Sequence, residues 1–208
     1  MPITKLQNQI QAAQFRIKFK DVFDLKDFYT MLHFLVLENG WSSVDSEGNI
    51  EEGQEHFETN YIERIDAGGT KNQGWWWRLQ KLPTDNSYYK YHLDLDFITL
   101  NLVPTEVMRD GKKFKVFKGT IEFWGYAYIE FDVGGKWSKH PFLKHLTRIF
   151  PNRIFKKDLY EHHKLELYRE TYTLQAWIKK WFKLKSFLPY EEITPFHPPR
   201  AHPAWKKE

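Results

Sequence analysis

The chain has 208 residues, of which 41% are hydrophobic and 18% aromatic, and this length suffices for one domain with a substantial core. The lack of cysteine excludes disulfides, thiolate zinc sites and a cysteine nucleophile, and the short apolar runs predict no transmembrane segment or signal peptide, hence a cytoplasmic protein. The net charge of +4 is uneven, because residues 1–135 carry 15 basic and 20 acidic side chains whereas residues 136–208 carry 16 and 7.

The N-terminal third predicts an arm, a strand and a helix, in that order. Residues 1–12 show no clear face and are expected to form an extended arm. Residues 14–20 alternate between apolar and basic side chains, which predicts a strand. Asp24 is a suitable cap for a helix over residues 25–38, which Asn39 and Gly40 would end. Residues 42–53 form an acidic loop.

The middle of the chain predicts strands joined by tight turns. Residues 56–66 and 74–82 form a predicted hairpin, and Trp75, Trp76 and Trp77 give its second strand an indole on both faces. A second predicted hairpin, residues 106–109 and 112–118, follows Pro104 and turns at Asp110–Gly111.

Two long runs, residues 88–102 and 119–133, alternate with a period of two and organise the predicted sheet. Their apolar faces should be buried beneath the C-terminal helix. The residues expected to be buried are Leu93, Leu95, Phe97, Ile121, Phe123, Ile129 and Phe131.

The C-terminal third predicts helices and then an extended arm. A short helix is expected over residues 141–150 and a long one over residues 158–186, with apolar residues recurring every seven positions. Residues 189–208 contain half of the prolines and cannot be helical. We therefore predict one α+β domain over residues 13–188, flanked by the two arms.

The predicted fold is a curled antiparallel sheet of about six or seven strands that carries an N-terminal helix and a long C-terminal helix. This order of elements resembles the helix-grip arrangement, a likeness of fold that implies no function. Three stretches, FRIKFKDVFDLKDFY, VMRDGKKFK and LYRETYTLQAWIK, resemble an uncharacterised family of archaeal proteins. That resemblance implies no activity.

The pattern His92-x-Asp94-x-Asp96 places three possible metal ligands on one face of the first long strand. The alternative is the solvated face of an amphipathic strand, paired with Lys90, Arg78 or another base. A metal-dependent enzyme built on these residues is one of three functional hypotheses.

Residues 124–131 resemble the aromatic strand of RNA-recognition motifs, in which the third and fifth positions, here Tyr126 and Tyr128, stack on bases. Trp124 stands where that motif has Lys or Arg, and residues 103–118 replace the helix that the family requires. The match therefore supports an aromatic surface rather than a true RNA-recognition motif.

The segment from residue 136 to residue 157 is basic and contains no acidic side chain. It is expected to contact nucleic acid, an anionic membrane surface or a neighbouring subunit, although a solvated helix with core aromatics is equally compatible. The expected anion-binding residues are Lys136, Lys139, Lys144, Arg148, Arg153, Lys156 and Lys157.

Two further patterns are weaker. Residues 176–185 look amphipathic, as an interfacial or a core helix would. The histidine pairs His140 and His145, and His162 and His163, are expected to be surface residues. No phosphate-binding glycine loop or nucleophile elbow is present.

The favoured hypothesis is a non-catalytic, self-assembling protein without a cofactor, whose basic portion contacts an anionic partner or a neighbouring subunit. Apolar residues on both arms and the opposite charges of the two portions support a homo-oligomer. A nucleic-acid-binding module and the metal-dependent enzyme are the alternatives.

Overall fold

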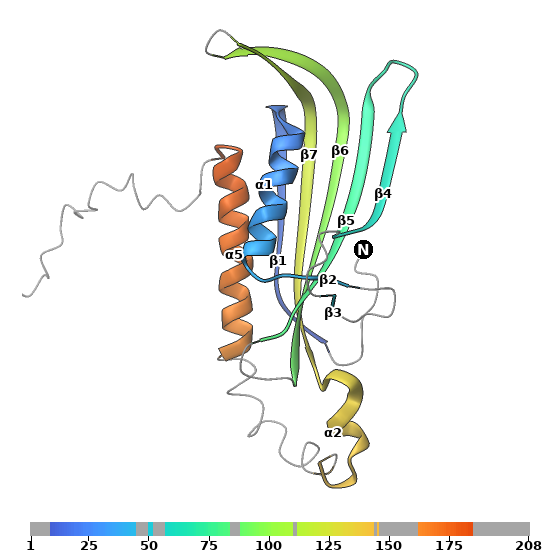
Figure 1. Ribbon diagram of the computed structural model, residues 1–208, viewed down its shortest axis with the longest axis vertical. Helices are drawn as coiled ribbons and strands as arrows, with labels where there is room; N and C mark the ends of the chain where they lie inside the picture. The colour runs from blue at the N-terminus through green and yellow to red at the C-terminus, as the bar shows by residue number, and fades with distance from the viewer. Residues whose placement is uncertain are drawn as a thin grey trace, which may run out of the picture.

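The computed structural model describes residues 9–44, 50–51, 57–83, 88–109, 112–143, 145 and 162–184. The described part is an α+β arrangement in which helices cover one face of an antiparallel sheet (Figure 1). The elements are β1 (Gln9–Phe23), α1 (Leu25–Glu38), β2 (Ser43–Val44), β3 (Ile50–Glu51), β4 (Glu58–Ile65), β5 (Lys71–Lys81), β6 (Tyr89–Arg109), β7 (Lys112–Phe131), the 3-10 turn η1 (Val133–Gly135), α2 (Lys136–Lys139) and α5 (Lys164–Trp181).

The main sheet has five strands in the order β1-β7-β6-β5-β4, and β2 and β3 form a separate two-stranded sheet. Every strand pair is antiparallel. The longest pair, β6 and β7, occupies the middle of the sheet, as the alternation of the two long runs predicts. The α+β class and the antiparallel sheet are therefore confirmed.

Helix α1 begins and ends where the sequence predicts. The Asp24 side chain accepts a hydrogen bond from the backbone N–H of Asp27 at 3.1 Å, which satisfies one of the unpaired donors of the first turn. At the other end Gly40 adopts a φ of 75°, a left-handed conformation that glycine tolerates and that stops a helix.

Aromatic side chains dominate the core between the helices and the sheet. Phe28 of α1 lies 5.1 Å from Phe123 of β7 and 5.0 Å from Trp181 of α5, measured between ring centroids. Phe97 of β6 stacks on Trp75 at 5.3 Å. Six of the seven residues expected to be buried are no more than 2% exposed, whereas Phe131 is only partly buried.

The sheet is not curled, so the predicted curl around a single helix is wrong. Helices α1 and α5 lie side by side and present a broad layer, which an open sheet covers without wrapping (Figure 1). Only the outer ends of β6 and β7 arch over the end of this helical layer (Figure 1).

The second predicted hairpin is not a separate element, because it forms the outer ends of β6 and β7. The β6–β7 register shifts between Leu100 and Val103, and Asn101 adopts a φ of 55° there. Gly119 lies opposite this bulge, where a Cβ would come within 2.8 Å of the Leu102 side chain. The bulge turns Leu102 into the core and allows the strands to bend.

Other boundaries differ from the prediction. Strand β1 begins at Gln9 rather than residue 14, and α5 (Lys164–Trp181) ends earlier than predicted, since residues 182–184 are not helical. Residues 158–161, where the predicted helix would begin, lie outside the described residues. Most of the predicted helix over residues 141–150, and the predicted arm over residues 189–208, lie outside the described residues.

Candidate functional site

The His92, Asp94 and Asp96 side chains lie on the sheet face opposite the two helices. Arg78 of β5 lies between the two aspartates, with Nη1 2.7 Å from Asp96 Oδ1 and Nε 3.7 Å from Asp94 Oδ1. His92 Nε2 lies 2.7 Å from Glu130 Oε2. The guanidinium thus supplies the positive charge that a cation would bring. This favours the amphipathic-strand interpretation, and metal binding here stays a prediction.

The electrostatics of this face follow from partial burial. Burial raises the pKa of the Asp94 carboxyl, and the Arg78 guanidinium opposes that shift. The hydrogen bond with His92 lowers the pKa of the Glu130 carboxyl. Paired charges of this kind stabilise a strand face.

The predicted aromatic surface belongs to the same face. The β6–β7 register sets Trp124 beside Asp96, Tyr126 beside Asp94 and Tyr128 beside His92. All three aromatic residues are partly buried. Burial is also the main cause of the raised pKa of the Tyr128 hydroxyl. The fold therefore merges two candidate sites that the sequence presents separately.

The bases nearest to these aromatics are paired with acids. Arg16 lies over the Trp124 ring at 5.3 Å from its centroid, and its Nη2 bonds Glu122 Oε2 at 2.8 Å. Lys18 Nζ lies 2.6 Å from the other oxygen of Glu122. Arg16, Lys18 and Arg78 face four carboxylates on this side of the sheet, Glu122, Asp94, Asp96 and Glu130, so these groups provide no surplus of positive charge for phosphate binding.

The predicted basic segment lies largely outside the described residues. Lys136 falls in α2, and the Lys139 side chain is exposed. Lys144, Arg148, Arg153, Lys156 and Lys157 are outside the described part of the chain. Binding of an anion through this segment stays a prediction.

A groove of about 880 Å³ opens beneath the arched ends of β6 and β7. Its walls are mostly apolar and come from β1, the arched strands and the end of α5. The apolar wall residues include Phe19, Phe23, Val107, Phe114, Val116 and Phe182. Three carboxylates, Asp21, Asp24 and Asp27, and one base, Lys183, also line it. Leu184, the last described residue before the C-terminal segment, lies on the same wall.

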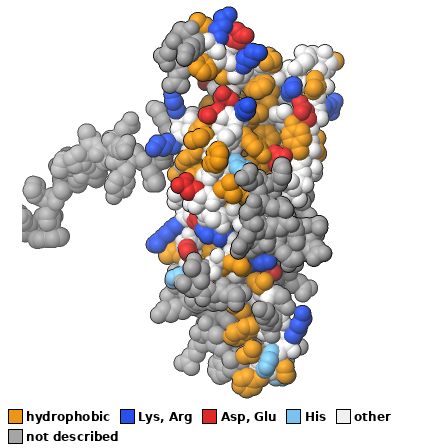
Figure 2. Space-filling view, in the orientation of Figure 1, with side chains coloured by type: hydrophobic (Ala, Val, Ile, Leu, Met, Phe, Trp, Pro, Cys, Tyr) orange, Lys and Arg blue, Asp and Glu red, His pale blue; other side chains and the backbone are white. Residues whose placement is uncertain are grey.

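The arched strands expose several large apolar side chains beside this groove. Val107 is 39% exposed, Phe114 45% and Met108 63%. Hydrophobic side chains reach the surface at this end of the molecule in the space-filling view (Figure 2). Apolar side chains exposed together beside a groove are typical of binding sites. The groove could not be predicted from the pattern of the second hairpin, because it forms only where the ends of β6 and β7 arch.

A smaller pocket of about 290 Å³ lies between α1 and α5, above Leu93 of β6. The Glu170 carboxylate on its wall accepts a hydrogen bond from Trp41 Nε1 at 2.8 Å and binds Lys81 Nζ at 3.0 Å. This volume is at the lower limit for a small-molecule site, and its polar group is already paired. We therefore interpret the pocket as a packing gap between the two helices.

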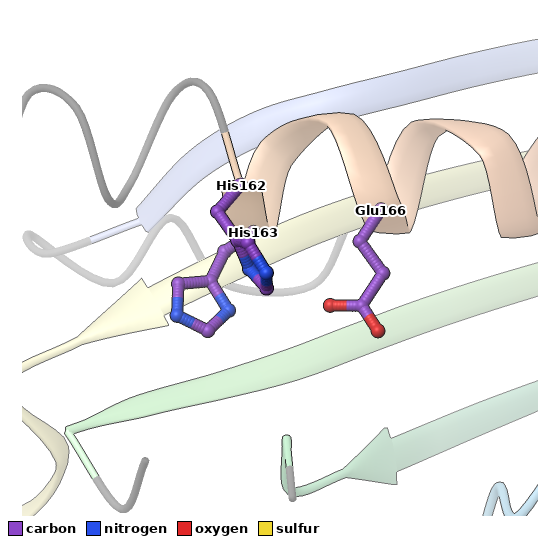
Figure 3. Close-up of side chains that lie close together, drawn as sticks. All are labelled: His162, His163 and Glu166. Carbon is purple, nitrogen blue, oxygen red and sulfur yellow. The ribbon is translucent and has the colours of Figure 1, made fainter. Parts of the chain in front are cut away.

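Helix α5 begins with a cluster of side chains whose polar atoms converge. One ligand atom each of His162, His163 and Glu166 lies within 4.8 Å of the other two (Figure 3). The Tyr91 hydroxyl of β6 lies 2.7 Å from His163 Nδ1 and 2.7 Å from Glu166 Oε2. His163 is only 3% exposed, so its prediction as a surface residue is wrong.

The packing of β6 against the start of α5 explains this burial. The Tyr89 ring lies 4.4 Å from the His163 imidazole, and Leu167 one turn later is fully buried. His162 and Glu166 stay exposed, four positions apart. That spacing could have been recognised in the sequence, whereas the contribution of Tyr91 depends on the tertiary fold.

Comparisons with known proteins assign no function to these sites. No protein-family model matches the chain, and no curated protein matches it. The resemblance to archaeal proteins therefore stays a prediction. Among the described residues, no helix combines the length and the hydrophobicity that crossing a membrane requires.

Proposed function

We propose that this is a non-catalytic association protein, in which the groove beneath the arched strands receives the C-terminal segment of a second copy. The observation that carries the proposal is the composition of the groove, an apolar surface bordered by three carboxylates. A purely solvating surface would not gather Val107, Phe114 and Phe182 around one depression.

The C-terminal segment has the complementary chemistry. Residues 185–208 contain apolar side chains that an extended segment would bury, among them Phe187, Tyr190 and Trp205. Lys185, Arg200, Lys206 and Lys207 can pair with the three groove aspartates, and Glu191, Glu192 and Glu208 reduce the net charge of the segment to +1. Apolar burial would hold the contact, because opposite charges in water contribute only about 1 kcal/mol at ~4 Å.

The place where the segment starts allows it to reach a neighbour. Leu184 lies on the groove wall, and the 24 residues that follow span about 80 Å when extended. A second copy is therefore within reach. Exchange of one terminal segment between identical chains is a heterologous contact, which closes into a ring or continues as a filament.

The test compares the native mass of three variants by size-exclusion light scattering. Deletion of residues 189–208 and the substitution Phe114→Asp should each reduce the mass of the assembly, because one removes the ligand and the other charges the groove. Met31→Asp is the matched control, because Met31 lies on α1 outside the groove and its side chain is 47% exposed, close to the 45% of Phe114.

Two results would contradict the proposal. Equal masses for all three variants and the intact protein would mean that the groove takes no part in association. A deletion that lowers the melting temperature of a protein that is monomeric throughout would mean that the segment binds in its own groove.

A further inference from the structure

We propose that His162, His163 and Glu166 form a binding site for a divalent transition metal, with zinc as its best match. The proposal is independent of self-association. Two imidazoles and one carboxylate are a common three-ligand set for zinc, and they leave the fourth position to water. The set lies at the start of α5, away from the groove at the other end of that helix.

The spacing of the donors suits one small ion. Their ligand atoms lie within 4.8 Å of one another, whereas a tetrahedral zinc ion spaces its ligand atoms about 3.3 Å apart. Each side chain would therefore move by less than ~1 Å to reach bonding distance. His162 and Glu166 are exposed and free to rotate this far, while the buried His163 fixes the position of the site.

Tyr91 gives the cluster the outer hydrogen bonds that metal ligands normally have. Its single hydroxyl proton donates to Glu166 Oε2, so the contact with His163 requires the imidazole to donate its Nδ1 proton to the Tyr91 oxygen. In that tautomer the lone pair of His163 is on Nε2, the form in which imidazole binds a metal. One residue thus orients a histidine and a carboxylate together.

The competing interpretation is a structural chain of hydrogen bonds that ties α5 to β6. Such a chain would account for Tyr91, His163 and Glu166. That chain of hydrogen bonds does not include His162, which is exposed. One ligand atom of His162 nevertheless lies within 4.8 Å of those of His163 and Glu166 (Figure 3). Three nitrogen and oxygen donors at one point are what a borderline metal such as zinc prefers, whereas magnesium and calcium prefer oxygen alone.

The test is calorimetric titration of the untagged full chain with zinc chloride, together with melting curves in zinc and in magnesium. We expect one zinc ion per chain, a higher melting temperature in zinc and no change in magnesium. His162→Ala and Glu166→Gln should abolish the stoichiometric binding. Both residues are exposed, so the variants should fold, and His145→Ala removes another exposed histidine as the control.

Tyr91→Phe separates a metal site from a structural hydrogen-bond chain. Loss of the hydroxyl should weaken zinc binding by about 10–100-fold, the usual effect of removing an outer-shell partner. The proposal is overturned if the intact protein binds no zinc, or if His162→Ala and Glu166→Gln bind it as tightly as His145→Ala does.

Discussion

Gly125 lies on β7 directly opposite Phe15 of β1, at a place where the two strands leave no room for a side chain. A Cβ at Gly125 would lie 2.3 Å from the Phe15 ring. Gly125→Ala should therefore destabilise the protein by about 1–3 kcal/mol, through displacement of a buried ring. Gly68→Ala is the matched control, since no atom lies within 4 Å of a Cβ there. Equal chemical denaturation midpoints for the two variants would contradict this packing.

Phe97 is the residue on which the aromatic core depends most directly. It is 1% exposed and contacts Trp75, Trp77 and Phe123. Phe97→Ala should reduce the free energy of unfolding by about 3–5 kcal/mol because it leaves a cavity. Phe34→Ala, at a side chain that is 61% exposed, should stay within about 0.5 kcal/mol of the parent. Similar losses in both variants would refute the assigned core.

Part of the dependence of stability on acidic pH is expected to come from Glu122. Hydrogen bonds from Lys18 and Arg16 lower the pKa of its carboxyl from the ordinary value of 4.5. A lowered pKa in the folded state stabilises the protein above pH 4.5, and the contribution disappears as the pH falls through the lowered pKa. The melting-temperature difference between Glu122→Gln and the parent should therefore shrink below pH 4.5. A difference that is independent of pH would rule out this ion pair as the cause.

Among the elements, α1 could be predicted accurately because its signals are local. The Asp24 cap, the apolar face and the terminal Asn39 and Gly40 are all within one short stretch. Asp24→Ala should cost about 1 kcal/mol, since the N–H of Asp27 loses its acceptor. Lys26→Ala, an exposed change in the same turn, should leave the melting temperature nearly unchanged. A comparable loss in both variants would indicate that the cap contributes nothing.

The extension of β6 past Pro104 could not be predicted from local signals. Proline normally marks a strand end because it lacks a backbone donor. Among the described residues, however, β6 pairs beyond Leu102 with β7 alone, so the other edge of the strand needs no backbone donor there. The arch likewise depends on a bulge at Asn101 that faces Gly119 across the strand pair. Contacts between distant segments decide both features.

In the candidate sites, too, some features could be predicted from the sequence and others depend on the fold. The alternation of β6 places His92, Asp94 and Asp96 on one face, but only the β5–β6 register sets Arg78 opposite Asp94. The four-residue spacing of His162 and Glu166 is visible in the sequence, whereas Tyr91 lies 75 residues from Glu166 and meets it through the fold. Periodicity therefore predicts faces, and register decides which charges are paired.

For the molecule as a whole, we propose that copies assemble through their own terminal segment. The two portions of the chain differ in charge, and the three aspartates of the groove belong to the acidic portion, although the end of α5 on its wall belongs to the basic one. The segment that would fill this groove belongs to the basic portion. Salt should weaken such a contact without abolishing it, because apolar burial supplies most of the binding energy.

The most direct test is the native mass of the intact protein, measured by light scattering over a range of protein and salt concentrations. We predict a mass above the 25.2 kDa of one chain, rising with protein concentration. When residues 189–208 are removed, the mass should fall to that of one truncated chain, which is below 25.2 kDa. A mass of 25.2 kDa at every protein and salt concentration would contradict self-association.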